Sequence, residues 1–338
     1  MFIALSLLIA LGVCEAQVVV DRATTIGEIK PMNGVNNGPL SPTIKGNVQG
    51  RNNTEVYAAA KFPFVRTHDA SIFYCYGGEH VVDITAIFPD FSKNPNYPAS
   101  YAFTLTDWYL NAIREAGSEP FFRLGQKIEN HIKKYNVFPP KDFKKWATIC
   151  EHIIRHYNEG WADGFHHNIV YWEIWNEPEV QDQMMWCGTD EEYYRLYDVT
   201  SKHLKACFPT LKIGGYASCG FYAVAPKTEI DPATNLPGTI PPSEHEEKLM
   251  NFFYGFFDYI KKHGSPIDFF SWHSYADATR VAVMDEWLHN ELKVLGYEGL
   301  ETHLNEWNPY CREFGTAHHS AEIAAMMIAL QHGHTDIL

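Results

Sequence analysis

The sequence predicts an α/β fold of the (β/α)8 TIM-barrel type, and three observations lead to this prediction. Seven short apolar segments alternate with helical stretches, as expected for parallel strands covered by helices on both faces. The 338 residues, of which 46% are hydrophobic, suffice for one large domain of about 250 residues or more. No GxGxxG turn follows the first segment, which disfavours a dinucleotide-binding unit, although a doubly wound sheet would share the same alternation.

The expected strands show little alternation of apolar and polar residues, which is typical of strands buried on both faces. They fall at residues 30–36, 62–68, 120–124, 169–175, 211–216, 267–273 and 300–306. Helical periodicity separates them and places, for example, Trp146, Ile149 and Ile153 on one face. The expected helices cover residues 54–60, 107–116, 141–157, 191–207, 244–262, 282–295 and 320–332, and Thr106 is the expected N-cap of the second.

Three long loops follow strands, at residues 69–104, 125–140 and 217–243. In a barrel these loops lie at the C-terminal face, where active sites are built. The proline-rich part, residues 226–242, is expected to be an irregular flap. Residues 335–338 resemble the start of an eighth strand, so the barrel is expected to be incomplete at its C-terminus. A closed barrel needs that strand, and residues 17–338 alone are therefore expected to be poorly soluble and weakly active.

Composition narrows the class of partner. The chain carries 27 Lys and Arg against 41 Asp and Glu, a net charge of −14, which disfavours nucleic-acid binding. Aromatic residues make up 14% of the chain, which suits stacking on sugar rings, although core packing accounts for most of them. No CxxC pair occurs among the seven cysteines, so no zinc site or other metal is expected, and no cofactor motif is present.

The N-terminus has the pattern of an export signal. Residues 2–13 are apolar apart from Ser6 and Gly12, and residues 14–16 offer a cleavage site before Gln17. The run is too short to span a bilayer, and no basic residue precedes it. We therefore expect a signal peptide at residues 1–16, a catalytic barrel at residues 17–338, and a secreted or periplasmic location. A buried N-terminal strand and a lipid anchor on Cys14 remain alternatives.

Two strand ends carry acidic residues in apolar surroundings. Residues 171–178 read YWEIWNEP and include Glu177, and residues 303–309 read HLNEWNP and include Glu306. A buried carboxylate is unfavourable unless it is paired or functional, and two carboxylates that meet across a barrel mouth suit glycoside hydrolysis. The alternative is that each glutamate makes a structural salt bridge.

With these motifs the chain resembles glycoside hydrolase family 39, the family of β-xylosidases and α-L-iduronidases. Residues 172–178 match the family's acid/base segment, and residues 304–308 match its nucleophile segment. Residues 64–68, FVRTH, match the second strand, and residues 268–275, DFFSWHSY, match the sixth. The resemblance covers nearly all of the chain after residue 16.

The resemblance implies a role for each matched residue. Glu177 is expected to be the general acid/base and Glu306 the nucleophile of a retaining, double-displacement hydrolase. Asn176 is expected to bind the sugar 2-hydroxyl, and Tyr275 to donate its hydroxyl to Glu306. The remaining expected site residues are His68 and His273 lining the glycone pocket and Arg66 beneath the nucleophile.

Three further side chains are interpreted from their positions in the sequence. Glu173 lies four residues before Glu177 and is expected to form a buried ion pair with Arg66 or Arg123. Trp186 follows Glu177 in a loop and is expected to form a wall of the substrate site, whereas Trp175 is expected to pack in the core.

The substrate is expected to be an oligosaccharide or glycoside with a β-linked neutral sugar, β-xyloside first. Iduronidases of the resembled family carry a Lys two residues after the sixth-strand His, and this chain has Tyr275 there. A β-glucoside, β-galactoside, α-L-arabinoside or α-L-iduronide remains an alternative. Two other classes compete: a non-catalytic sugar-binding protein on the same scaffold, and a metal-dependent hydrolase, for which no HExxH spacing is present.

Overall fold

A computed structural model describes residue 23 and residues 27–41, 52–68, 82–126, 137–180, 185–231, 236–309 and 314–338. Among these residues, seven parallel strands form one curved sheet in the order β1-β2-β3-β4-β5-β8-β9. The strands are β1 (Val35–Asn36), β2 (Phe64–Arg66), β3 (Glu119–Leu124), β4 (Tyr171–Ile174), β5 (Lys212–Ser218), β8 (Phe269–Ser274) and β9 (Glu301–Trp307). Each lies within or beside a predicted strand, and the barrel prediction is confirmed. The predicted leader, residues 1–16, lies outside the described residues.

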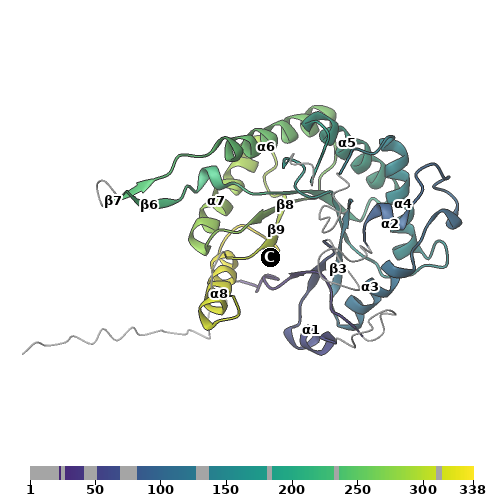
Figure 1. Ribbon diagram of the computed structural model, residues 1–338, viewed down its shortest axis with the longest axis horizontal. Coiled ribbons are helices and arrows are strands. Elements are labelled where there is room, and N and C mark those ends of the chain that lie inside the picture. The colour runs from purple at the N-terminus through teal and green to yellow at the C-terminus, as the bar shows by residue number, and fades with distance from the viewer. Residues whose placement is uncertain are drawn as a thin grey trace, which may run out of the picture.

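Helices alternate with the strands and surround them on the outside (Figure 1). They are α1 (Thr54–Ala60), α2 (Ile84–Ile87), α3 (Thr104–Glu115), α4 (Phe143–Glu159), α5 (Asp190–Cys207), α6 (Glu244–His263), α7 (Ala278–Leu295) and α8 (Ala317–Gln331). The expected start of α3 was wrong, because the helix begins at Thr104 and Thr106 is buried inside it. Both α5 and α6 begin with a capping box, at Thr189 and Ser243. None of the described helices combines the length and the apolar character that a membrane span requires.

The core lies between the strands and the helices, whereas the barrel interior is polar near its C-terminal end. Trp172 of β4 stacks on Phe122 of β3 with ring centroids 4.9 Å apart, and both side chains are fully buried. On the other face, Glu173 of β4 contacts Arg66 of β2 and Asn305 of β9. Since neither β2 nor β9 neighbours β4 in the sheet, these contacts cross the barrel interior.

Residues 335–338 lie between β9 and β1, as the sequence predicts for the start of an eighth strand. Leu304 N donates to Ile337 O at 3.0 Å, and Gly34 N donates to Leu338 O at 2.7 Å. Gly34 permits this approach, because a Cβ there would lie 2.8 Å from the Leu338 carbonyl oxygen. A cavity of about 320 Å³ beside this segment is lined by residues of β1 and β9, and Arg66 and Glu306 are among its lining residues.

The segment expected to be an irregular flap contains a β-hairpin. Its strands β6 (Thr228–Asp231) and β7 (Leu236–Thr239) pair antiparallel and project away from the barrel beside α6 and α7 (Figure 1). The prolines misled the prediction. In a two-stranded hairpin every strand is an edge, so the missing N–H of Pro237 can face outward without breaking the ladder.

Candidate active site

Strands β4 and β9 bring the two predicted carboxylates to one end of the barrel. Glu306 lies on β9, and Glu177 lies three residues beyond β4 in a segment that we call the acid loop (residues 175–180). One oxygen of Glu177 and one of Glu306 lie within 4.8 Å of each other. The acid loop bends sharply, with φ of 76° at Trp175 and 45° at Glu177, a strain of about 1–3 kcal/mol per residue that functional sites commonly hold.

Glu306 lies among hydrogen-bond donors and cations. Tyr275 donates its hydroxyl to Glu306 Oε1 at 2.7 Å, and Arg66 Nη1 donates to Oε2 at 3.2 Å. The imidazoles of His68 and His273 lie 3.6 and 3.7 Å from Oε2. Burial alone would raise the pKa of Glu306, but His273, His68, Arg66 and the Tyr275 hydroxyl together hold that pKa well below its usual range. The carboxylate is therefore charged at neutral pH, as a nucleophile must be.

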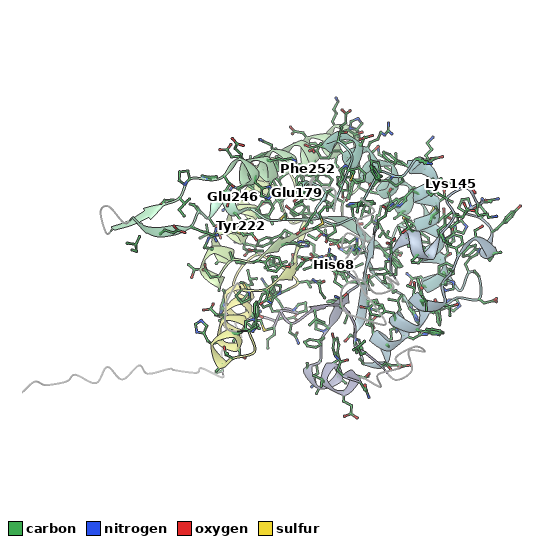
Figure 2. All side chains as sticks on the ribbon, viewed as in Figure 1. His68, Lys145, Glu179, Tyr222, Glu246 and Phe252 are labelled. Atoms are coloured by element: carbon green, nitrogen blue, oxygen red, sulfur yellow. The ribbon has the colours of Figure 1, made fainter. Side chains whose placement is uncertain are left out.

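His273 joins the two carboxylates. Its Nδ1 hydrogen-bonds Glu177 Oε1 at 2.7 Å and lies 3.7 Å from Glu306 Oε2, and the side chain is fully buried. The sequence predicts His273 as a wall of the glycone pocket, whereas the structure places it against both carboxylates. His68 also reaches Glu306, and Figure 2 shows it in the central region enclosed by the barrel.

A buried ion network supports the site from below. Arg66 donates to Glu173 Oε2 at 2.7 Å and to Asn176 Oδ1 at 2.6 Å, in addition to its contact with Glu306. Asn305 donates to the other oxygen of Glu173 at 2.6 Å. Of the two partners expected for Glu173, the structure thus selects Arg66. Asn176 Nδ2 has no partner among the described residues, which leaves a buried amide donor beside the carboxylates.

Trp186 is a core residue, and the prediction that it forms a substrate wall is wrong. Its side chain is fully buried, and its indole N–H donates to Thr189 O at 2.9 Å. The ring packs edge-on against Trp175, with centroids 5.0 Å apart. Trp175 is itself fully buried, as expected, so the two indoles pack in the core rather than presenting a face to a sugar.

A second hollow, of about 850 Å³, is lined by Tyr275, which donates to Glu306, but by neither carboxylate. It lies among the hairpin strand β6 and the beginnings of α6 and α7, and Tyr275 and Cys219 form its inner end. Figure 2 shows Tyr222 and Glu246, two of its lining residues, on the side of the molecule that faces the hairpin. Tyr275 thus has its hydroxyl on Glu306 and a half-exposed ring beside this hollow.

Two groups of side chains have ligand atoms close enough for a cation, among the residues that the structure describes. One is Glu177, His273 and Glu306, and the other is Glu151, His203 and Cys207 on α4 and α5. In each group a guanidinium already neutralises a carboxylate: Arg66 lies 3.2 Å from Glu306, and Arg155 lies 2.8 Å from Glu151. Positive charge at both places therefore comes from the chain itself.

Sequence reasoning missed the side chains behind Glu177. Glu179 is fully buried two residues further on, and it contacts Ser218 and Cys219 at the end of β5. The second glutamate of the run Asn176-Glu177-Pro178-Glu179 was the available signal, since a carboxylate so close to a buried strand end is unusual.

Comparison with known proteins places this geometry in a family. The family model described as glycosyl hydrolases family 39 matches residues 47–302. The chain belongs to glycosyl hydrolases family 39. The family expected from the sequence motifs is thereby confirmed. The roles of Glu177 and Glu306 stay predictions, and Glu306 lies just beyond the matched residues.

Individual relatives cover part of the chain. A β-xylosidase of Caldicellulosiruptor saccharolyticus is 28% identical over 194 residues, which are 54% of this chain and 33% of that protein. Human α-L-iduronidase is 30% identical over 118 residues, which are 34% of this chain and 17% of that protein. The chain thus spans a third or less of the length of these two relatives.

A solved structure supports the fold. The crystal structure of a glucosidase from Croceicoccus marinus superimposes with a TM-score of 0.71 at 24% identity, covering 92% of this chain and 60% of the other. At this level of identity the likeness concerns the barrel and not the substrate.

Proposed function

We propose that the protein is a retaining glycoside hydrolase that cleaves a β-linked neutral sugar by double displacement. The separation of the two carboxylates carries this proposal. Retaining enzymes hold their carboxyl groups about 5–5.5 Å apart, whereas inverting enzymes need roughly 6.5–9.5 Å to admit a water molecule. Oxygens of Glu177 and Glu306 within 4.8 Å favour the retaining arrangement.

In the first step Glu306 attacks the anomeric carbon while Glu177 gives its proton to the leaving oxygen, so that a glycosyl-enzyme forms. The low pKa of Glu306 keeps the nucleophile charged. Tyr275 and Arg66 each hold one oxygen of Glu306, which fixes the direction of the carboxylate. In the second step Glu177, now a carboxylate, takes a proton from a water molecule whose oxygen attacks the anomeric carbon. The bond from that carbon to Glu306 breaks, which frees the sugar and restores both carboxyl groups.

Asn176 is suited to bind the sugar. Its Oδ1 is held by Arg66, so its orientation is fixed, and its Nδ2 is free to donate to a hydroxyl of the sugar bound at Glu306. The hollow beside Tyr275 and Cys219 offers room for the leaving group, because Tyr275 contacts Glu306 and Cys219 interacts with Glu177.

The preference for a neutral sugar rests on charge. An iduronide brings a carboxylate, which needs a cation that is not already paired. Arg66 already contacts Glu173, Glu306 and Asn176, so its guanidinium has little capacity left for a substrate. Tyr275, which stands where the resembled iduronidases carry a Lys, has a pKa raised by burial and by Glu306, and its phenol stays neutral. Similarity to a β-xylosidase supports β-xyloside as the first substrate to test.

The test is a kinetic comparison of aryl β-xyloside, β-glucoside, β-galactoside, α-L-arabinoside and α-L-iduronide, with Glu306→Ala as the inactive control. We expect the highest kcat/KM on the β-xyloside. Proton NMR of the first product anomer then distinguishes retention from inversion. Faster cleavage of the iduronide would refute the substrate class, and an inverted first product would refute the mechanism.

A further inference from the structure

We propose that Glu179 is a positioning residue, which acts through Cys219 to keep the proton donor Glu177 aligned with the leaving group. This inference rests on the function proposed above. It concerns a buried carboxyl group to which the two-carboxylate mechanism gives no task.

Glu179 joins the acid loop to the end of β5. Its Oε1 accepts a hydrogen bond from the backbone N–H of Cys219 at 2.6 Å and one from the Ser218 hydroxyl at 3.0 Å. Its side chain is fully buried, and its Oε2 has no partner among the described residues. A carboxyl group in such a place is retained at a considerable desolvation penalty, which points to a task beyond filling space.

Cys219 completes the connection to the proton donor. Burial, Glu177 and Glu179 raise the pKa of its thiol, which therefore keeps its proton beside the carboxyl group of Glu177. The backbone N–H of Glu177 in turn donates to Ala217 O at 3.0 Å. Glu177 and Glu179 thus hydrogen-bond residues 217–219 at the end of β5 and hold this part of the acid loop against that strand.

The charge of Glu179 suits this task. Burial raises the pKa of Glu179 to about 8, so the carboxyl group is neutral at pH 7. Among the residues that the structure describes, the main electrostatic partners of Glu179 are Glu177, Cys219, Tyr193, Tyr194 and Tyr216. None of these partners is a cation, so an ionised Glu179 would add a negative charge beside Glu177. That charge would oppose the release of the proton from Glu177 to the leaving group.

Leaving-group dependence separates positioning of the acid from simple structural support. A disaccharide releases a poor leaving group and needs the proton from Glu177, whereas a 2,4-dinitrophenyl glycoside leaves without it. Loss of the alignment of Glu177 therefore slows the disaccharide and spares the dinitrophenyl glycoside in the glycosylation step. General damage to the site slows both.

The experiment measures kcat/KM on both substrates for Glu179→Ala, Glu179→Gln, Cys219→Ala and Cys219→Ser. We expect the two alanine variants to lose about 10- to 100-fold on the disaccharide and less than about threefold on the dinitrophenyl glycoside. Gln keeps the acceptor at Oε1 and Ser keeps a donor, so both should recover most of the activity. Cys150→Ala, which removes a buried thiol on α4, is the matched control and should match the wild type.

Equal losses on both substrates, or no loss on the disaccharide, would overturn the inference. If Glu179→Ala does not fold, the same two-substrate comparison of Cys219→Ala with Cys219→Ser tests the inference. A wild type that cleaves neither substrate would refute the proposed function instead. In that case the alkylation rate of Cys219, followed by peptide mass spectrometry, tests the link directly. We expect Glu179→Ala to raise that rate about tenfold and Glu179→Gln to leave it unchanged, and equal rates in all three proteins would overturn the link.

Discussion

Replacement of Glu179 by Gln should make the stability of the protein less dependent on pH. The ordinary pKa of a Glu carboxyl is 4.5, and burial raises that of Glu179 to about 8 in the folded protein. Between these values the unfolded chain has released a proton that the folded protein still holds. The free energy of unfolding therefore falls as pH rises through this window, because the unfolded state binds fewer protons. The contribution is fully present below pH 4.5 and is lost on the approach to pH 8.

The magnitude follows from the shift. Each pKa unit corresponds to about 1.4 kcal/mol, so the rise from 4.5 to about 8 amounts to roughly 5 kcal/mol in total. Between pH 5 and pH 8, the free energy of unfolding of Glu179→Gln should rise by roughly 4 kcal/mol relative to that of the wild type. This difference should grow by about 1.4 kcal/mol per pH unit. Gln has no proton to release, and its amide retains the oxygen that accepts from Cys219 and Ser218.

Urea unfolding followed by tryptophan fluorescence at pH 5, 6, 7 and 8 measures this difference. Subtracting the variant from the wild type removes the contributions of all other titrating groups. Glu246→Gln is the control. Hydrogen bonds from the backbone N–H and the hydroxyl of Ser243 outweigh burial and lower the pKa of Glu246 below its ordinary 4.5, so this carboxyl group is ionised in the folded and the unfolded chain between pH 5 and pH 8, and its difference should not change with pH. A pH-independent difference for Glu179→Gln, or a slope of the opposite sign, would show that Glu179 is ionised in the folded protein.

Four further substitutions test the site. With an activated aryl glycoside, Glu177→Ala should accumulate a glycosyl-enzyme that intact-mass spectrometry detects, and azide should restore turnover. Glu306→Ala should form no such intermediate. Near-normal cleavage of a disaccharide by Glu177→Ala would contradict its role as the acid. Tyr275→Phe removes the hydroxyl 2.7 Å from Glu306, so kcat should fall about tenfold and the acid limb of the pH–rate profile should move to higher pH. Arg66→Leu leaves Glu173 and Glu306 without their guanidinium and should reduce the free energy of unfolding by about 3–5 kcal/mol, as measured in urea, and an unchanged midpoint would contradict the buried network.

The sequence by itself determined the order of strands and helices and the two carboxylates. Apolar runs without alternation located all seven barrel strands, because burial on both faces leaves a signal in the local sequence. Glu177 and Glu306 were identified for the same reason, since an acidic residue at the end of such a run stands out locally. The hairpin β6–β7 escaped, because its prolines resemble a loop until the pairing partner is known.

Only the tertiary structure decided which side chains meet. Arg66 and Glu306 are 240 positions apart, and His273 and Glu177 are 96 apart, so no local pattern could reveal their contacts. Trp186 follows Glu177 in a loop and looked available to a sugar, yet packing against Trp175 buries it completely. The carboxyl group of Glu179 is neutral only because the fold buries it beside the end of β5. Local periodicity reports whether a residue is buried, but the chemistry of a buried group depends on neighbours that the closed barrel brings from distant strands.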